Sequence, residues 1–126
     1  MPKQTLELLP QEFTIHSFDV DDDIPAEVLA SPLYFLGKTP DELSIVVPSD
    51  IALTSLDSDT GWRAMEIIGP LHLSMVGIMA QIGKVLADAK VAIFVVSTFD
   101  TDFFLLKNNK LDDAVNALRA AGYTIR

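Results

Sequence analysis

Two aspartates near the tip of an apolar hairpin are the residues whose types and spacing best suit binding chemistry. The stretch Val-Val-Ser-Thr-Phe-Asp-Thr-Asp-Phe-Phe-Leu-Leu, residues 95–106, places them between two apolar runs. Because strands that are buried on both faces are apolar throughout, this stretch predicts a central hairpin. Asp100 and Thr101 are good turn formers, and we interpret them as such. Asp102 opens an apolar strand, where a carboxylate needs a partner or water, so it is a candidate to hold an ammonium group.

A second candidate lies where an apolar helix is predicted to start, over residues 76–89. The first N–H groups of a helix have no internal partner and carry the positive end of the dipole, so they can hold a carboxylate. Gly77 would let a ligand approach the backbone closely. Together with Asp102, this helix start would bind a free amino acid. Alternatively, solvent or Ser74 caps the helix, and the residues alone leave both possibilities open.

The remaining polar motifs do not assemble a catalytic or metal site. The acidic run over residues 19–23 lacks the central Gly and the twelfth-position Glu of an EF-hand, so we interpret it as a solvated loop. His16 and His72 have no metal-ligand spacing, and there is no cysteine. We expect His16 at the surface or a sheet edge. His72 precedes the helix and is a candidate to line a site there.

Motifs for nucleotides and nucleophiles are also missing: there is no glycine-rich phosphate loop and no nucleophile elbow. The sequence therefore predicts no catalytic residues, no metal and no cofactor, and a protein that is not an enzyme.

The composition excludes several classes of partner. The chain has 126 residues, 49% of them hydrophobic, and a net charge of −9, so it can bury a core. Its basic residues form no cluster, which argues against nucleic acid. No apolar run is long enough for a membrane span, and the start lacks the regions of a signal peptide. We expect a cytoplasmic protein.

The second half of the chain gives a clear order of elements. We expect strands over residues 62–68, 92–99, 102–107 and 123–125 and helices over residues 76–89 and 109–121. Asn109 is the expected N-cap of the second helix, and Gly122 the residue that ends it. The order strand, helix, strand, strand, helix, strand predicts a ferredoxin-like unit.

The first half resembles a degraded copy of the second. A shift of 60 residues places residues 33–36 on 93–96 and 43–47 on 103–107, and it aligns Glu42 with Asp102. A strand over residues 13–16 and a short helix over 25–30 precede this hairpin. We expect a degenerate N-terminal unit over residues 1–60 and a second unit over 61–126, with a polar junction in residues 55–61.

The segments Gly-Ile-Met-Ala-Gln-Ile (77–82), Leu-Ala-Asp-Ala (86–89) and Ser-Thr-Phe-Asp-Thr-Asp (97–102) resemble ACT domains. More narrowly, they resemble the paired ACT type of CASTOR-like arginine sensors and small bacterial relatives, akin to aspartokinase regulatory domains. The resemblance implies an α+β fold of two ferredoxin-like (βαββαβ) ACT units with antiparallel sheets, the first degenerate, and an amino-acid ligand at the interface between units. By position, the ligand-binding residues would be His72, Leu73, Ser74, Met75, Val76, Gly77, Ile78, Thr98, Phe99 and Asp102, with Asp102 taking the α-ammonium.

The same resemblance bears on ligand and assembly. The arginine sensors have an acid two residues before the Gly-Ile pair, where this chain has Met75, so a neutral or small amino acid is expected instead of arginine. A full four-unit site would require a homodimer, and the helix over residues 76–89 is apolar on more than one face. We expect a non-catalytic regulatory or sensor module that binds an amino acid. The alternative is a structural or protein-interaction module with a vestigial pocket, a partner of a metabolic enzyme.

Overall fold

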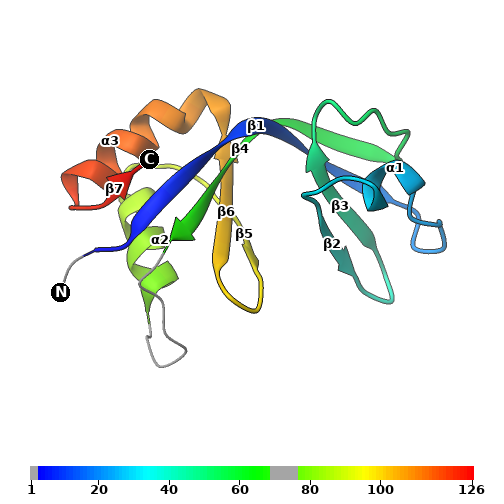
Figure 1. Cartoon of the computed structure of the whole chain (residues 1–126), viewed down its shortest axis with the longest axis horizontal. Coiled ribbons are helices and arrows are strands. Elements are labelled where there is room, and N and C mark those ends of the chain that lie inside the picture. Colours follow the sequence, from blue (N-terminus) through cyan, green and yellow to red (C-terminus); the bar gives the residue numbers. More distant parts are fainter. Residues whose placement is uncertain (1–2, 69–76) are drawn as a thin grey trace. The chain divides into compact units, whose positions relative to one another are not determined.

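The computed structural model describes residues 3–68 and 77–126 (Figure 1). The chain forms two compact units. The C-terminal unit contains Met1–Pro10 and Arg63–Arg126, and the N-terminal unit contains Gln11–Trp62. Both boundaries fall inside strands, one in β1 (Thr5–Phe18) and one in β4 (Asp57–Ile68).

The C-terminal unit has the predicted order of elements. After β4 come α2 (Ile78–Asp88), β5 (Phe94–Ser97), β6 (Asp102–Lys107), the short 3-10 helix η1 (Asn108–Lys110), α3 (Leu111–Ala120) and β7 (Thr124–Ile125). The hairpin β5–β6 is antiparallel, with Ser97 opposite Asp102. The prediction of an α+β fold with an antiparallel hairpin between two helices is therefore confirmed.

One strand of this unit comes from the beginning of the chain. The strands lie in the order β7-β1-β4-β6-β5, so β1 separates β7 from β4. Thr5 pairs with Thr124 and Leu6 with Ile125 in parallel register, and the N–H of Arg126 donates to the carbonyl of Leu6 at 2.8 Å. Residues 3–10 thus belong to the C-terminal unit, whereas they were expected in the N-terminal one. Alternation within β1 could not reveal this, because it fixes a strand but not its partner.

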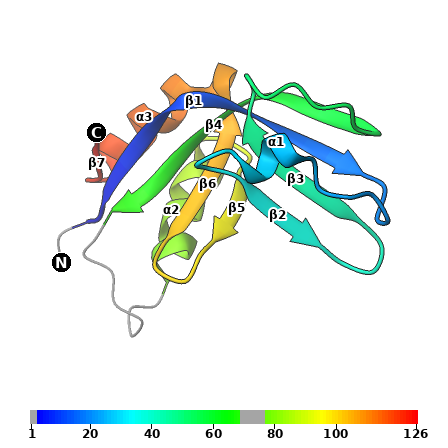
Figure 2. The same cartoon turned by 45° about the vertical axis from the view of Figure 1, so that its right-hand side comes forward.

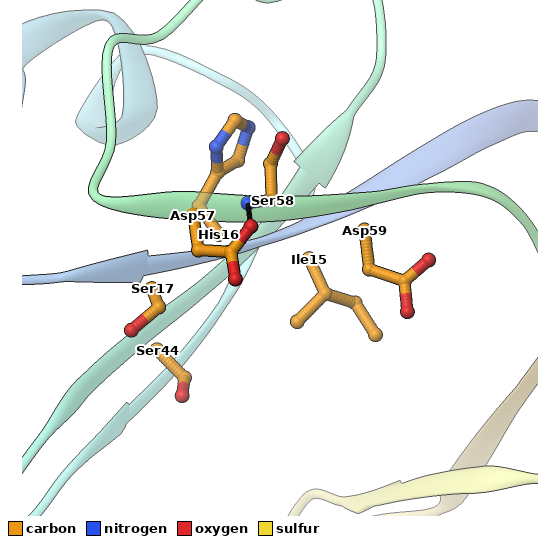
Figure 3. A pocket seen from close by; sticks show the side chains of 7 residues that line it. All are labelled: Ile15, His16, Ser17, Ser44, Asp57, Ser58 and Asp59. Carbon is orange, nitrogen blue, oxygen red and sulfur yellow. Dashed lines mark hydrogen bonds between the residues drawn. The ribbon is translucent and has the colours of Figure 1, made fainter.

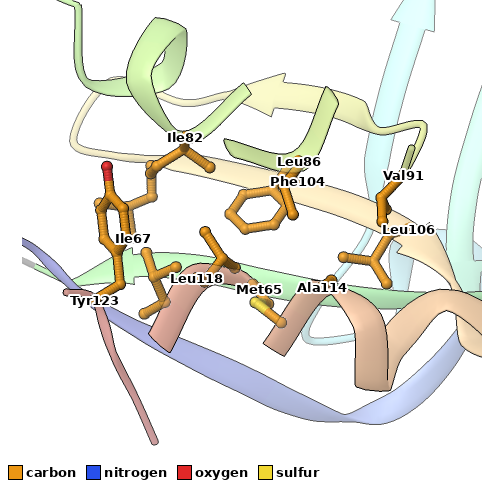
Figure 4. Packing of buried hydrophobic residues seen from close by; sticks show 11 residues of the cluster. Met65, Ile67, Ile82, Leu86, Val91, Phe104, Leu106, Ala114, Leu118 and Tyr123 are labelled. Carbon is orange, nitrogen blue, oxygen red and sulfur yellow. The ribbon is translucent and has the colours of Figure 1, made fainter. Parts of the chain in front are cut away.

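The core of the C-terminal unit lies between its sheet and the helices α2 and α3 (Figure 4). Met65 and Ile67 of β4 and Phe104 and Leu106 of β6 alternate onto the helix-covered face, as strand geometry requires. The helices contribute buried side chains at helical spacing, and the other core residues come from β1 and the loops. The cluster consists of Leu6, Met65, Ile67, Ile82, Leu86, Val91, Phe104, Leu106, Ala114, Leu118 and Tyr123.

The N-terminal unit is smaller, and its only helix is short. It contains the end of β1, α1 (Ala26–Leu29), β2 (Phe35–Lys38), β3 (Leu43–Pro48) and the start of β4. Residues 49–56 connect β3 to β4 without a helix. They are too few for a helix of the length of α3 plus its connections. A complete βαββαβ plan is therefore absent from Gln11–Trp62, and the expected junction is partly strand, because β4 begins at Asp57.

A single small helix covers the core of this unit. Val28 of α1 is fully buried, and it packs with Phe18 of β1 and with three residues of β3, Leu43, Ile45 and Val47. Figure 2 shows α1 above the hairpin β2–β3. The predicted short helix and the predicted hairpin are both confirmed.

The two hairpins correspond at a shift of 59 residues, one less than the sequence analysis used. This shift places both ends of β2 and β3 on the ends of β5 and β6. Thr39 and Thr98 then hold the same position, and the N–H of each donates to the carbonyl three residues on, Glu42 and Thr101 respectively. Glu42 therefore corresponds to Thr101, and Asp102 to Leu43. The expected pairing of Glu42 with Asp102 is wrong, since an error of one residue moves a side chain to the other face of a strand.

Both long helices end in a left-handed residue. At the end of α3, Gly122 has φ 100°, its N–H donates to Arg119, and the N–H of Tyr123 donates to Leu118. This is a Schellman motif, which confirms the expected role of Gly122. The expected N-cap Asn109 is wrong, because residues 108–110 form a 3-10 turn and α3 begins after Lys110.

We expect a Lys90→Gly variant to be more stable than the unmodified chain by about 0.5–1 kcal/mol. Lys90 occupies the same Schellman position after α2, with φ 63°, where a side chain is disfavoured. Its N–H donates to Ala87, and that of Val91 to Leu86, both at 2.9 Å. Urea denaturation measures the change. Lys90→Ala is the control, because it keeps Cβ and should gain nothing, and Gly122→Ala should lose stability.

Candidate functional site

The turn between β5 and β6 is held by one threonine hydroxyl. The N–H of Thr98 donates to the carbonyl of Thr101 at 2.8 Å. The hydroxyl of Thr98 donates to the same carbonyl at 3.1 Å and accepts from the N–H of Thr101 at 3.3 Å. These bonds close a tight loop around Phe99 and Asp100, so the turn has a defined shape.

A further hydrogen bond ties this turn to β4. The hydroxyl of Thr101 donates to the carbonyl of Ile67 at 2.6 Å, across 34 positions of the sequence. The contact is partly buried, and Ile67 is a core residue. The sequence predicts Thr101 only as a turn former. Its contact could not be found from the sequence, because it depends on β4 and β6 being neighbours in the sheet.

Phe99 and Asp102, two of the predicted site residues of this turn, differ in exposure. Phe99 is 90% exposed, whereas Asp102 is half-buried at the first position of β6. In the part of the chain that the structure describes, the carboxylate of Asp102 has no hydrogen-bond or ion-pair partner. A half-buried carboxylate without a partner favours a cationic ligand group, since partial burial weakens its hydration.

The backbone at the start of α2 is accessible. Gly77 is the N-cap, with φ 77°, and no described side chain caps the helix there. A Cβ built on Gly77 would meet no atom within 4 Å, so the backbone is accessible. Ile78 is half-buried and packs against the core. In Figures 1 and 2 the start of α2 and the β5–β6 turn lie at the same end of the C-terminal unit.

Half of the predicted ligand-binding residues lie outside the described residues. They are His72, Leu73, Ser74, Met75 and Val76, all between β4 and α2. The described part of the predicted site therefore consists of Gly77, Ile78, Thr98, Phe99 and Asp102. Asp102 supplies a carboxylate, and Gly77 opens a helix that no described side chain caps. These are the two groups that the sequence predicts to act together.

The N-terminal unit has a separate polar pocket with a volume of about 270 Å³ (Figure 3). Its lining residues are Ile15, His16, Ser17, Ser44, Asp57, Ser58 and Asp59. Figure 3 shows the ring of His16 and the side chain of Ser58 on one side of β4, with Ile15, Ser17 and Ser44 on the other. None of the ten predicted ligand-binding residues lines this pocket, and no motif of the sequence indicated it.

His16 is buried and is hydrogen-bonded to the segment 49–56. This segment connects β3 to β4, at the place in the order of elements where the C-terminal unit has α3. His16 is 6% exposed, which corrects the expected surface position. Its Nδ1 lies 2.9 Å from the hydroxyl of Ser55, which itself donates to the carbonyl of Asp57 at 2.9 Å. Because that hydroxyl has one hydrogen, Nδ1 must be the donor to it. Burial lowers the pKa of His16, since the charged ring loses its hydration.

The described residues hold no group of three or more His, Cys, Asp or Glu side chains that could bind a metal ion. None of the helices within residues 3–68 and 77–126 is long and apolar enough to cross a membrane.

The fold and the open helix start define a helix-covered α+β module with a small polar site. The sequence profile of the ACT domain matches residues 57–120, about half of the chain. The chain therefore belongs to the ACT domain family, as the resemblance of its motifs indicated.

Part of the chain is also similar to curated relatives. The human cytosolic arginine sensor for mTORC1 subunit 1 is 36% identical over 73 residues, which are 57% of this chain and 22% of the sensor. The match thus spans about a fifth of that curated relative and of its bovine counterpart.

Solved structures have the same fold. Protein Atu0741 from Agrobacterium tumefaciens has a TM-score of 0.91 and 30% identity, covering 100% of this chain and 94% of that one. The regulatory subunit of aspartate kinase from Thermus thermophilus has a TM-score of 0.66 and 15% identity, covering 92% and 96%. This second likeness concerns the fold alone.

We expect the free energy of unfolding to fall as the pH is lowered below 6.5, the ordinary pKa of histidine. Burial lowers the pKa of His16 in the folded chain, so in this range the unfolded chain binds more protons. Urea denaturation between about pH 8 and pH 5.5 measures the slope. His16→Asn keeps a hydrogen-bonding group near Ser55 but cannot titrate, so its slope should be smaller. An equal slope in both proteins would contradict this account.

Proposed function

We propose that this chain is a non-catalytic regulatory module that binds a small amino acid through its C-terminal unit. The observation that carries the proposal is the carboxylate of Asp102, half-buried and without a partner among the described residues, on a turn closed by Thr98. Membership of the ACT domain family supports the regulatory role.

The two ends of an amino acid suit two features of the unit. The α-ammonium would pair with Asp102, which gives a charge-assisted hydrogen bond. The α-carboxylate would accept from the first N–H groups of α2, where Gly77 leaves the backbone open. The segment with His72, Leu73, Ser74, Met75 and Val76 would complete the site. The proposal includes a division into an N-terminal ACT-like unit and a C-terminal ACT unit.

The ligand proposed is neutral or small. One relative is named an arginine sensor, and it shares 36% identity over the matched 73 residues. In this chain Met75 stands where the resemblance places an acid in such sensors, and a thioether offers a guanidinium no charged partner. We also propose a cytoplasmic location and no cofactor.

A homodimer is part of the proposal, since one chain has fewer units than a four-unit site. The exposed face of α2 carries Ala80, Gln81, Lys84, Ala87 and Asp88. The expectation that this helix is apolar on more than one face is wrong for its exposed face, which is small and polar. Its small side chains would still allow close approach of a second copy. Gly83 is half-buried, with open space where a Cβ would lie.

The alternative function is a protein-interaction module with a vestigial pocket, acting on a metabolic enzyme. One observation favours it: Phe99 is 90% exposed on a hydrogen-bonded turn. A rigid exposed aromatic loses little entropy when it enters a pocket of a partner.

We expect Asp102→Ala to weaken amino-acid binding by about 1.5–3 kcal/mol, the scale of a hydrogen bond to a charged group. Thermal shift with the twenty amino acids identifies the ligand, and calorimetry then measures its affinity. Asp100→Ala is the matched control, because it removes the same charge from the same turn but from an exposed position. Its affinity should stay near that of the unmodified chain.

The same panel tests the choice of ligand. Neutral small amino acids should bind more tightly than arginine or lysine. Tighter binding of arginine would contradict the argument from Met75, and the absence of any amino-acid ligand would favour the interaction module.

Sedimentation measures the proposed self-association. We expect a dimer at micromolar concentrations, and Gly83→Glu should convert it to single chains if α2 lies in the interface. A mass of one chain for the unmodified protein would exclude the dimer at those concentrations. Asn116→Glu is the control, because it adds the same negative charge at an exposed position of the other long helix, α3.

A further inference from the structure

We propose that Thr101 is a positioning residue that holds Asp102 at a fixed place relative to the start of α2. The inference rests on the proposed amino-acid site and names the interaction that gives it selectivity for the α-ammonium. It requires no contact between Thr101 and the ligand.

The geometry gives Thr101 two separate roles in the turn. Its backbone closes the loop with Thr98, through a bond of 2.8 Å from the N–H of Thr98 to its carbonyl. Its hydroxyl does not take part in that loop but donates to Ile67 at 2.6 Å. The loop would therefore keep its own shape without the hydroxyl, but it would lose a tether to β4.

The position of Ile67 explains what the tether fixes. Ile67 is next to the last residue of β4, the strand from which the chain continues toward α2. It is 1% exposed, so its carbonyl belongs to a residue that is packed in the core of the unit. Asp102 follows Thr101 directly, so the tether limits where its carboxylate can point.

The other hairpin provides an internal comparison. At the corresponding position it has Glu42, and the loop is closed by Thr39, whose hydroxyl accepts from the N–H groups of Asp41 and Glu42, both at 3.1 Å. Closing such a loop thus needs the first threonine but no hydroxyl at the second position. The hydroxyl of Thr101 is therefore not explained by turn formation, and the site that it orients explains it.

Selectivity for the ammonium group is the quantity to measure. The probes are the panel amino acid that binds the unmodified chain most tightly and its 2-hydroxy acid, which lacks the ammonium. Thr101→Val keeps the branched shape and removes the donor. We expect it to weaken binding of the amino acid about tenfold, the scale of one lost hydrogen bond, and to leave binding of the 2-hydroxy acid nearly unchanged.

Three further proteins separate positioning from stability. Thr101→Ser keeps the hydroxyl and should keep the selectivity, and Thr124→Val, at an exposed position of β7, should change nothing. In an Asp102→Ala background, Thr101→Val should cause no additional loss, since it acts through that carboxylate. If Thr101→Val does not fold, Thr101→Ala is the second variant without a hydroxyl.

The outcomes distinguish this inference from the function on which it rests. Equal weakening of both probes, or losses that add with Asp102→Ala, would overturn the positioning role and leave the amino-acid site standing. Failure of the unmodified chain to bind any amino acid would overturn both. Loss of selectivity in Thr101→Val together with its retention in Thr101→Ser supports the inference.

Discussion

The pairing of β1 with β7 is the constraint on which the C-terminal unit depends. It brings Leu6 into a core otherwise built from residues beyond Arg63, and it joins the first and last strands of the chain. Because the two strands are parallel, no short turn can connect them, and their pairing brings together segments from the two ends of the sequence. The unit that carries the proposed site is therefore complete only when both ends of the chain are in place.

Threonine hydroxyls define the local shape of both hairpins. The hydroxyls of Thr39 and Thr98 each hold a loop by accepting hydrogen bonds from backbone N–H groups. These N–H groups would otherwise be unpaired in the tight turn. Only the C-terminal hairpin adds a tether to a neighbouring strand, through Thr101. The hairpin that carries Asp102 is thus the one that is fixed in two ways, which suits a binding site built on a rigid support.

The N-terminal unit has polar contacts at the segment 49–56, which takes the place that α3 has in the C-terminal unit. Thr14 contacts Ser49 at 2.8 Å and His16 contacts Ser55 at 2.9 Å, so two polar residues of β1 hold the ends of segment 49–56. These hydrogen bonds satisfy polar groups that would be costly to bury alone. They allow a short connection to cover the end of a small core.

The sequence by itself determined the order of elements, both hairpins, the role of Gly122 and the ACT family, because periodicity, turn residues and family motifs are local signals. The same local signals predicted that Asp102 and Gly77 belong to one candidate site. Only the tertiary structure decided that β1 completes the C-terminal sheet, that His16 is buried and that Thr101 bonds to Ile67. Each of these depends on which strands become neighbours, and alternation along a single strand carries no information about its partner.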